Sequence, residues 1–301
     1  MRIFITGVSG YAGYYAALRL AEVGHLVTGL VRHPDQQRLG LLRLHEILLL
    51  QGDVAEPGSY RDALAESDVL IHTMLDKKRP LDTDRALFAA LEALPPGTPA
   101  RRFIYTTGCS IFGKLPIAVM DETAEPNPDH PLAFRRSLER EALALKNVRT
   151  TVLRPGFMFG YDGYNSVAAD WFELAESGDP VFRGDRERGW SWIHIADLAE
   201  AYRLAAEAEE AAVAGEIFHL ADDLRPLSLE VMRACVAATG ATKEIRFEGP
   251  KQGDNISTWF NQNEFITAKK AKERLGWRAR HAGVIESAPR VYRAWKAVNA
   301  E

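Results

Sequence analysis

The sequence predicts an α/β protein with a doubly wound parallel sheet and a smaller C-terminal lobe. Short apolar runs alternate with amphipathic segments of helix length through residue 154, which is the pattern of parallel strands joined by crossover helices. The first apolar run leads directly into a glycine-rich turn and a helix. Hydrophobic residues make up 47% of the 301 residues and charged residues 26%, a balance that predicts a sizeable core and not disorder.

The first strand and helix carry the clearest functional pattern. Residues 3–5 form a strand, residues 6–13 a turn, and a helix continues to near residue 24. Gly7 permits the tight turn, Gly10 lets the backbone approach a pyrophosphate, and Gly13 lets the helix pack close to the strand. The helix N-terminus offers free N–H groups to the phosphates, so this context predicts a Rossmann dinucleotide site, with an ordinary surface turn as the alternative. The expected pyrophosphate contacts are Gly7, Ser9, Gly10, Tyr11, Ala12 and Gly13.

The second strand, residues 26–31, bears on the choice of cofactor. Arg32 follows it directly, and the first acid, Asp35, comes only after Pro34. An acid at the strand end would bind the ribose 2′-hydroxyl of NAD, whereas the arginine fork suits the 2′-phosphate of NADP. We therefore expect NADP(H) to be preferred, with NAD(H) as the other possible cofactor and a solvated Arg32 as the alternative interpretation.

The next strands end in further candidate cofactor contacts. The third strand, residues 46–50, is followed by Asp53 and Val54, and Asp53 is also placed to cap a helix at residues 57–65. The fourth strand, residues 68–73, ends in Thr73, Met74 and Leu75. Ligands of parallel sheets bind at the carboxyl ends of the strands, so we expect these three residues to line the cofactor groove. Helices over 82–94 and 132–146 alternate with strands over 102–107 and 149–153.

The remaining sequence predicts helices over 165–177, 197–209, 228–239, 268–275 and 283–299, and a strand over 216–220. Asp197, Ser228 and Thr267 are the expected caps of three of these helices. Gly276 is the expected stop of the fourth. We find no internal repeat, low-complexity tract or cluster of metal ligands in the sequence.

Four motifs together resemble those of the extended short-chain dehydrogenase/reductase superfamily, the group with the sugar epimerases and dehydratases. They are G-x-x-G-x-x-G after Thr6, the segment 153–160 like L-R-P-G-x-x-Y-G, the segment 192–198 like F-V-H-V-x-D-L, and R-L-G-W at 274–277. The resemblance implies that Asp53 contacts the adenine and that the segment beginning at Pro155 passes the nicotinamide. The further contacts expected on this basis are Val54, Thr107, Pro155, Gly156 and Phe157.

The catalytic groups of that superfamily are missing from the matching positions. Its serine or threonine falls at Gly108, and its Tyr-x-x-x-Lys pair falls at Phe134 and Leu138. Phenylalanine cannot transfer a proton and leucine carries no charge. The catalytic residues are therefore unknown at this stage, and the weak candidates for a proton donor are Ser110, His130, Tyr161 and Tyr164.

These observations leave two classes of function. The first is an NAD(P)-dependent oxidoreductase that acts on a small, apolar or aromatic substrate with an unusual proton donor; the second is an inactive NADP(H)-binding sensor or partner-binding module. The aromatic residues after Gly156 suggest the substrate class, although core packing explains such residues equally well. Trp190 replaces an arginine that nucleotide-sugar enzymes carry four residues before His194, which disfavours a sugar-nucleotide substrate.

Domain boundaries and partners follow from the same patterns. We expect a Rossmann domain over 1–156, rejoined by about 190–222, and a substrate lobe from 157–189 and 223–301. The formal net charge of −4 disfavours nucleic-acid and membrane-surface binding. We expect a cytoplasmic protein, because the sequence has only two cysteines, no signal-like start and no long apolar run. By analogy with the superfamily, we expect a homodimer through the helices at 82–94 and 132–146.

Overall fold

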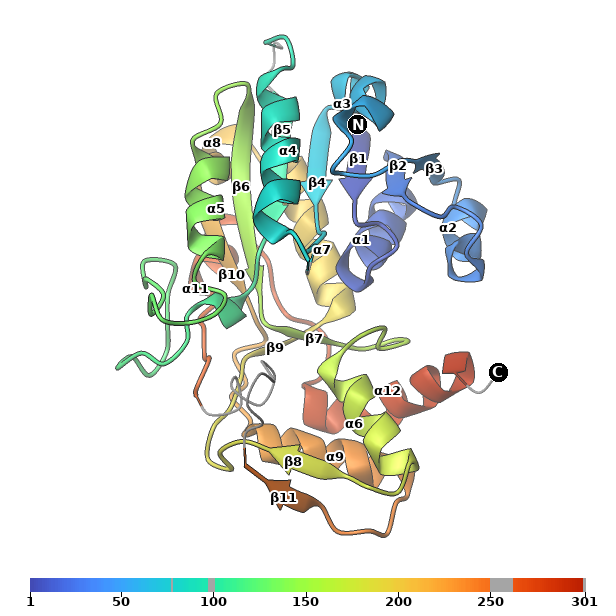
Figure 1. Ribbon diagram of the computed structural model, residues 1–301, viewed down its shortest axis with the longest axis vertical. Helices are drawn as coiled ribbons and strands as arrows, with labels where there is room; N and C mark the ends of the chain where they lie inside the picture. The colour runs from blue at the N-terminus through green and yellow to red at the C-terminus, as the bar shows by residue number, and fades with distance from the viewer. Residues whose placement is uncertain (77, 97–100, 250–261, 300–301) are drawn as a thin grey trace.

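A seven-stranded parallel sheet organises the computed structural model (Figure 1), which describes residues 1–76, 78–96, 101–249 and 262–299. The strand order is β10-β6-β5-β4-β1-β2-β3, so the chain winds outward in both directions from β1. All pairs in this sheet are parallel. The predicted doubly wound α/β fold is confirmed. The strands are β1 (Arg2–Thr6), β2 (Leu26–Val31), β3 (Leu48–Gln51), β4 (Val69–His72), β5 (Arg101–Thr106), β6 (Val148–Pro155) and β10 (Ile217–Leu220).

Helices cover both faces of the sheet and give it two hydrophobic layers. One layer packs β1, β2 and β4 against α1 (Tyr11–Glu22), α7 (Ile195–Glu207) and α11 (Lys269–Arg274). The other packs the opposite face against α3 (Arg61–Glu66), α4 (Pro80–Glu92) and α5 (Arg135–Leu143). Because both faces are covered, the inner strands β1, β4, β5 and β6 are buried along most of their length. The short helices α2 (Gly40–Leu44) and α8 (Glu210–Val213) complete this body, with η1 (Gln37–Leu39), η2 (Pro57–Ser59) and η3 (Cys109–Ile111).

A smaller lobe lies beyond the carboxyl ends of the strands (Figure 1). It contains α6 (Val167–Glu176), α9 (Ser228–Thr239) and α12 (Val284–Asn299), with the paired strands β8 (Val181–Arg183) and β11 (Arg246–Glu248). A second pair, β7 (Phe157–Phe159) and β9 (Trp192–His194), connects it to the sheet. Aromatic side chains dominate its core. Within the stretch 223–301, residues 268–277 instead pack on the α1 and α7 layer of the sheet, where Trp277 is fully buried.

A fully buried ion pair ties α5 to β6. Arg154 donates to Glu139 from Nε at 2.8 Å and from Nη2 at 2.5 Å, and both side chains are shielded from solvent. The Thr107 hydroxyl donates to the same carboxylate at 2.5 Å. Breaking such a pair leaves an uncompensated charge in the interior, which costs about 3–5 kcal/mol. The pair therefore holds α5, β6 and the segment at Thr107 in fixed positions where β5 and β6 end.

Two of the expected helix caps are wrong. Helix α7 begins at Ile195, and His194 caps it by accepting the Ala196 N–H at Nδ1. Asp197 lies inside the first turn, where its carboxylate accepts the N–H groups of Arg280 and His281. Ser228 is the first residue of α9, not its cap, and its buried hydroxyl has no partner within the described residues. The Thr267 hydroxyl does accept the Lys269 N–H at the start of α11.

Two features are absent from the residues that the structure describes. None of the helices there is long and apolar enough to cross a membrane. No group of three or more metal-ligating side chains comes together among the same residues.

Candidate cofactor and active site

The glycine turn between β1 and α1 has the close geometry expected of a dinucleotide site. Gly7 has a φ of +79°, a conformation that favours glycine. A Cβ at Gly13 would lie 2.4 Å from the Gly7 carbonyl oxygen, so only glycine lets α1 approach β1 this closely. A Cβ at Gly10 would meet only the Gly7 carbonyl oxygen, at 3.2 Å. Helix α1 starts at Tyr11 without a side-chain cap, which leaves its first N–H groups for an anion.

The side chains of Tyr11 and Ala12, two other residues of the turn, are used in contacts within the protein. The Tyr11 hydroxyl donates to the Gly160 carbonyl oxygen at 2.5 Å, and the side chains of Tyr11 and Ala12 are buried. Ser9 is partly exposed. Tyr11 and Ala12 therefore offer a ligand their backbone, while Ser9 also offers its side chain.

Three segments at the neighbouring strand ends complete this edge of the sheet. The Thr73 hydroxyl donates to the Thr6 carbonyl oxygen at 3.0 Å, which joins the ends of β4 and β1. Met74 packs on the hydrophobic layer beneath it, and Leu75 is exposed. Asp53 accepts the Ala55 N–H at Oδ1, so one carboxylate oxygen caps the local turn. Val54 is buried.

Two arginines, Arg32 and Arg38, follow β2, at whose end a 2′-phosphate would be recognised. Arg32 is exposed directly after the strand. Arg38, which sequence reasoning missed, lies between the rings of Tyr14 and Tyr164 at 4.4 and 3.9 Å and pairs with Asp162. Its Nε and Nη2 atoms are buried and have no partner within the described residues. The signal that would have found it is a second arginine six residues after Arg32.

The structure shows what occupies the three positions where the superfamily carries its catalytic groups. Leu138 is only 1% exposed and packs in the hydrophobic layer under the sheet. Phe134 packs on the same layer just before α5 begins. At Gly108 a Cβ would have room, 3.7 Å from the Pro155 carbonyl oxygen and 3.9 Å from Ser110 Oγ. The helix face at 134 and 138 is therefore structural.

The four weak candidates for a proton donor divide into two groups. Ser110 lies beside Gly108, and His130 is buried next to Gly113, where a Cβ on Gly113 would lie 2.8 Å from that of His130. Tyr161 packs on the Tyr15 ring of α1 at 4.8 Å, and Tyr164 stacks on Arg38. The first two are near the ends of β5 and β6, and the two tyrosines are on the α1 side.

A carboxyl group that sequence reasoning missed lies close to the first pair. Glu264 is fully buried, and burial raises its pKa to about 8 despite the nearby Gln262 amide and Gly113 N–H. Its Oε1 lies 2.9 Å from the terminal amide nitrogen of Gln262, which lies 3.3 Å from His130 Nε2. Its Oε2 is buried without a partner among the described residues. No sequence pattern points to Glu264, because a lone glutamate in a strand-like segment belongs to no motif.

Phe157 and Trp190 form an aromatic wall where the chain leaves β6. Their rings stack with centroids 3.8 Å apart. Gly156 makes this possible, because a Cβ there would lie 2.6 Å from the Ser191 carbonyl oxygen. The backbones of Trp190 and Glu264 form a β-bridge, so the buried carboxyl group belongs to the segment paired with this wall.

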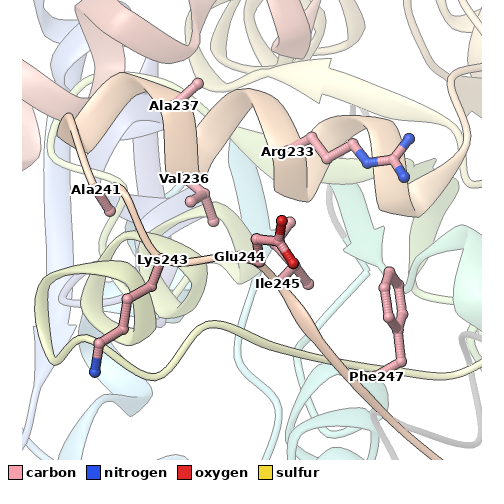
Figure 2. Close-up of a pocket in the computed structure, with 8 residues that line it drawn as sticks. All are labelled: Arg233, Val236, Ala237, Ala241, Lys243, Glu244, Ile245 and Phe247. Carbon is pink, nitrogen blue, oxygen red and sulfur yellow. The ribbon is translucent and has the colours of Figure 1, made fainter.

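The lobe also carries an open hollow of about 410 Å³, away from the sheet edge. Figure 2 shows it between α9 and the segment leading into β11. Its lining combines charged and apolar side chains: Arg233, Val236, Ala237, Ala241, Lys243, Glu244, Ile245 and Phe247. None of the predicted site residues lies in this hollow.

The raised pKa of Glu264 predicts a pH-dependent stability. An exposed glutamate has a pKa of about 4.3, so between about pH 4.3 and 8 the folded chain holds this proton more tightly than the unfolded chain. The contribution of Glu264 to stability therefore falls as the pH rises through this range. Glu264→Gln removes the effect, and its melting temperature should exceed that of the wild type by more at pH 8.5 than at pH 5.

The control is Glu173→Gln, which alters an exposed glutamate on α6. It should leave the melting temperature nearly unchanged at both pH values. Equal differences between Glu264→Gln and the wild type at pH 5 and pH 8.5 would contradict a neutral, buried carboxyl group.

The chain matches the NAD dependent epimerase/dehydratase family over residues 3–221. An uncharacterized protein of Schizosaccharomyces pombe is 25% identical over 95% of this chain and 97% of its own length. A 2-alkyl-3-oxoalkanoate reductase of Stenotrophomonas maltophilia is 26% identical over 81% of this chain and 77% of its own length.

Solved structures confirm the fold. A dTDP-glucose 4,6-dehydratase of Bacillus anthracis, in complex with NAD, superposes with a TM-score of 0.83 at 16% identity, over 99% of this chain and 97% of that one. A UDP-glucose 4-epimerase of Thermotoga maritima gives a TM-score of 0.81 at 18% identity over the whole of both chains. The family match covers the glycine turn, the seven strands and the junction with the lobe, and this chain belongs to the NAD-dependent epimerase/dehydratase family.

Proposed function

We propose that this protein is an NADP(H)-preferring oxidoreductase that acts on a small, apolar or aromatic carbonyl compound or alcohol. The observation that carries the proposal is the combination of a complete dinucleotide turn with an aromatic wall at the end of β6. The turn leaves the first N–H groups of α1 without a cap. The wall presents Phe157, stacked on Trp190, just after the segment that the family uses beside its nicotinamide.

The residues present fit a nicotinamide dinucleotide. The α1 N-terminus suits a pyrophosphate. Arg32 is exposed directly after β2, and two nitrogens of Arg38 are buried N–H donors without a partner within the described residues. Such donors suit the 2′-phosphate of NADP. When bound, the cofactor would supply or accept the hydride. The protein's part is to orient the substrate against Phe157, to exclude water and to place a proton donor.

Two observations support an apolar substrate over a sugar nucleotide. Trp190 is fully buried against Phe157, in the position where nucleotide-sugar enzymes carry an arginine. The relative from Stenotrophomonas maltophilia is named for a 2-alkyl-3-oxoalkanoate, a ketone that carries an alkyl group. An aromatic wall binds such groups by burying their apolar surface.

A cofactor-binding module without turnover is the second candidate. It is favoured by the buried, structural state of Leu138 and by the missing side chain at Gly108. General acid catalysis contributes about 10²–10⁴-fold, so losing the usual donor slows hydride transfer without preventing it. For this reason we place the oxidoreductase first.

The cofactor preference is tested by calorimetry with NADP(H) and NAD(H). We expect the wild type to bind NADP(H) at least about tenfold more tightly, since a charge-assisted phosphate contact contributes about 1.5–3 kcal/mol. Arg32→Asp should lose this preference and keep its NAD(H) affinity. Arg293→Asp, which makes the same charge change at an exposed position on α12, should retain it. A wild type that prefers NAD(H) would contradict the assignment.

The proposed bypass of the superfamily's tyrosine is tested at Phe134. Since Phe134 packs on the hydrophobic layer and carries no proton, Phe134→Ala should lower the melting temperature and leave NADPH turnover per folded molecule within about threefold. Turnover is screened on aldehydes, ketones and enones, and folding is checked by circular dichroism. Loss of turnover in a folded, cofactor-binding variant would show that this position takes part in the chemistry.

We also propose a homodimer through the outer faces of α4 and α5. The Arg85 guanidinium and the Glu141 carboxylate, 2.8 Å apart, join these two helices, and small side chains at Ala89 and Ala144 are exposed beside them. Light scattering at micromolar concentration should give twice the mass of the chain. Ala89→Arg should shift the mass toward the monomer, whereas a monomeric wild type would contradict this proposal.

We further propose a cytoplasmic location. Cys109 and Cys235 are both buried and free, and free thiols of this kind suit a reducing compartment. Burial raises the pKa of both thiols above the ordinary value, which keeps them protonated and unreactive.

A further inference from the structure

The buried cluster of His130, Gln262 and Glu264 contains more polar groups than its packing requires. His130 and Gln262 are each 8% exposed and Glu264 is fully buried. A buried carboxyl group with one unpartnered oxygen is costly to the fold, and Glu264 Oε2 is such an atom. A cluster of this kind in a native protein calls for a functional explanation.

The hydrogen bonds of the cluster determine where its protons lie. The Leu132 N–H donates to His130 Nδ1 at 3.3 Å, so the proton of a neutral His130 is on Nε2, which must find an acceptor. The Gln262 amide atom that faces Nε2 at 3.3 Å also faces Glu264 Oε1 at 2.9 Å. Rotating the side-chain amide of Gln262 by about 180° places its carbonyl oxygen, in place of the nitrogen, at this position. The carbonyl oxygen then accepts a hydrogen bond from His130 Nε2. It accepts a hydrogen bond from Glu264 only if the Glu264 carboxyl group carries a proton.

The surrounding charges favour the same arrangement. Burial lowers the pKa of His130, so the ring is neutral at pH 7. The thiol of Cys109 is buried, and the pKa of this thiol is raised by burial first and by the charge of Glu264 second. Among the described residues, His130 is connected to Glu264 through Gln262, and the Cys109 thiol interacts with the charge of Glu264. No cation there is paired with the Glu264 carboxyl group, so burial keeps this group neutral.

The position of Glu264 relates this acid to the candidate active site. Its backbone bridges Trp190, which stacks on Phe157 just beyond the end of β6. Glu264 also interacts with Cys109, whose pKa is raised by burial and by the charge of Glu264 and which follows Gly108 at the end of β5. Gly108 and Phe157 belong to the two segments that the superfamily places around its nicotinamide and substrate.

We propose that Glu264 is the acid that replaces the missing tyrosine, with Gln262 and His130 as positioning residues that keep it protonated. The inference rests on the proposed oxidoreductase function. In the reducing direction, hydride adds to the carbonyl carbon, the C=O π pair moves to oxygen, and that oxygen takes the proton of the Glu264 carboxyl group. The products are the alcohol, the oxidised cofactor and the Glu264 carboxylate, which then takes up a proton from the solvent. In the oxidising direction the carboxylate accepts the alcohol proton.

The test measures proton release on cofactor binding and needs no substrate. The oxidised nicotinamide ring carries a positive charge that the reduced ring lacks, so it favours ionisation of a nearby carboxyl group. Titration calorimetry in buffers of different ionisation enthalpy should show that NADP⁺ releases about 0.3–0.5 more protons than NADPH near pH 8. The 2′-phosphate is common to both cofactors and cancels in the difference. The difference should vanish at pH 6, where Glu264 stays protonated in both complexes.

Two variants identify the carboxyl group that releases the proton. Glu264→Gln should abolish the difference, while Glu122→Gln, which alters another carboxyl group whose pKa burial raises, should retain it. The pH profile of the wild type supplies the same test without a variant. If both cofactors bind and the difference is absent at pH 8, or persists in Glu264→Gln, the assignment of Glu264 is overturned. If neither NADP(H) nor NAD(H) binds, the proposed function itself fails.

Where a turnover substrate is found, a further readout separates a catalytic from a structural role. Carbonyl reduction by the wild type should fall above about pH 8, as the neutral acid is lost. Glu264→Gln should lower kcat by about 10²–10⁴-fold with little change in the affinity for NADPH. An unchanged kcat in Glu264→Gln would overturn the proposal.

Discussion

The buried contact between Glu139 and Arg154 is the interaction on which the arrangement of the site depends. It connects the helix that follows the 107–113 segment to the strand that leads into the lobe, and it also engages Thr107. Arg154 Nη1 lies 3.2 Å from His219 Nε2 on β10, which extends the network across the sheet edge. The ends of β5, β6 and β10 are thereby fixed together. Gly108 and Phe157, at two of these ends, are held in fixed positions around the place expected for the nicotinamide.

Helix α5 has a packing role in this network. In the superfamily this helix carries a tyrosine and a lysine toward the cofactor. Here the corresponding positions, Phe134 and Leu138, pack into the hydrophobic layer, while the next residue, Glu139, forms the buried ion pair. A helix that packs and pairs in this way stabilises the fold. Glu264, fully buried near the Gly113 N–H, is the acid that we propose in place of the tyrosine.

The fold was predictable because its determinants are local. Apolar runs and glycine positions are visible in the sequence, and the close approach of Gly13 to Gly7 follows from the strand–turn–helix context. The observed element boundaries differ from the predicted ones where the backbone turns sharply. The third strand begins at Leu48, because Glu46 has a φ of +58°. Helix α5 begins at Arg135, after the turn that contains His130.

The site was less predictable because its polar groups come from distant segments. Arg38 and Asp162 are 124 residues apart, and His130 and Gln262 are 132 apart. No spacing rule relates such pairs, and a buried glutamate looks like a surface one in the sequence. The candidate tyrosines Tyr161 and Tyr164 contact Tyr15 of α1 and Arg38 of η1, respectively.

The most direct test of the oxidoreductase assignment is the transfer of deuterium from NADPH labelled at C4 to a carbonyl substrate. The purified protein is incubated with aldehydes, ketones and enones, and the products are analysed by mass spectrometry. Gly10→Leu serves as the control, since a Cβ there meets only the Gly7 carbonyl oxygen at 3.2 Å while the side chain fills the space expected for the pyrophosphate. We expect one deuterium on the reduced carbon with the wild type and none with the control. Tight NADPH binding without deuterium transfer to any of these compounds would contradict the oxidoreductase assignment and favour a binding module.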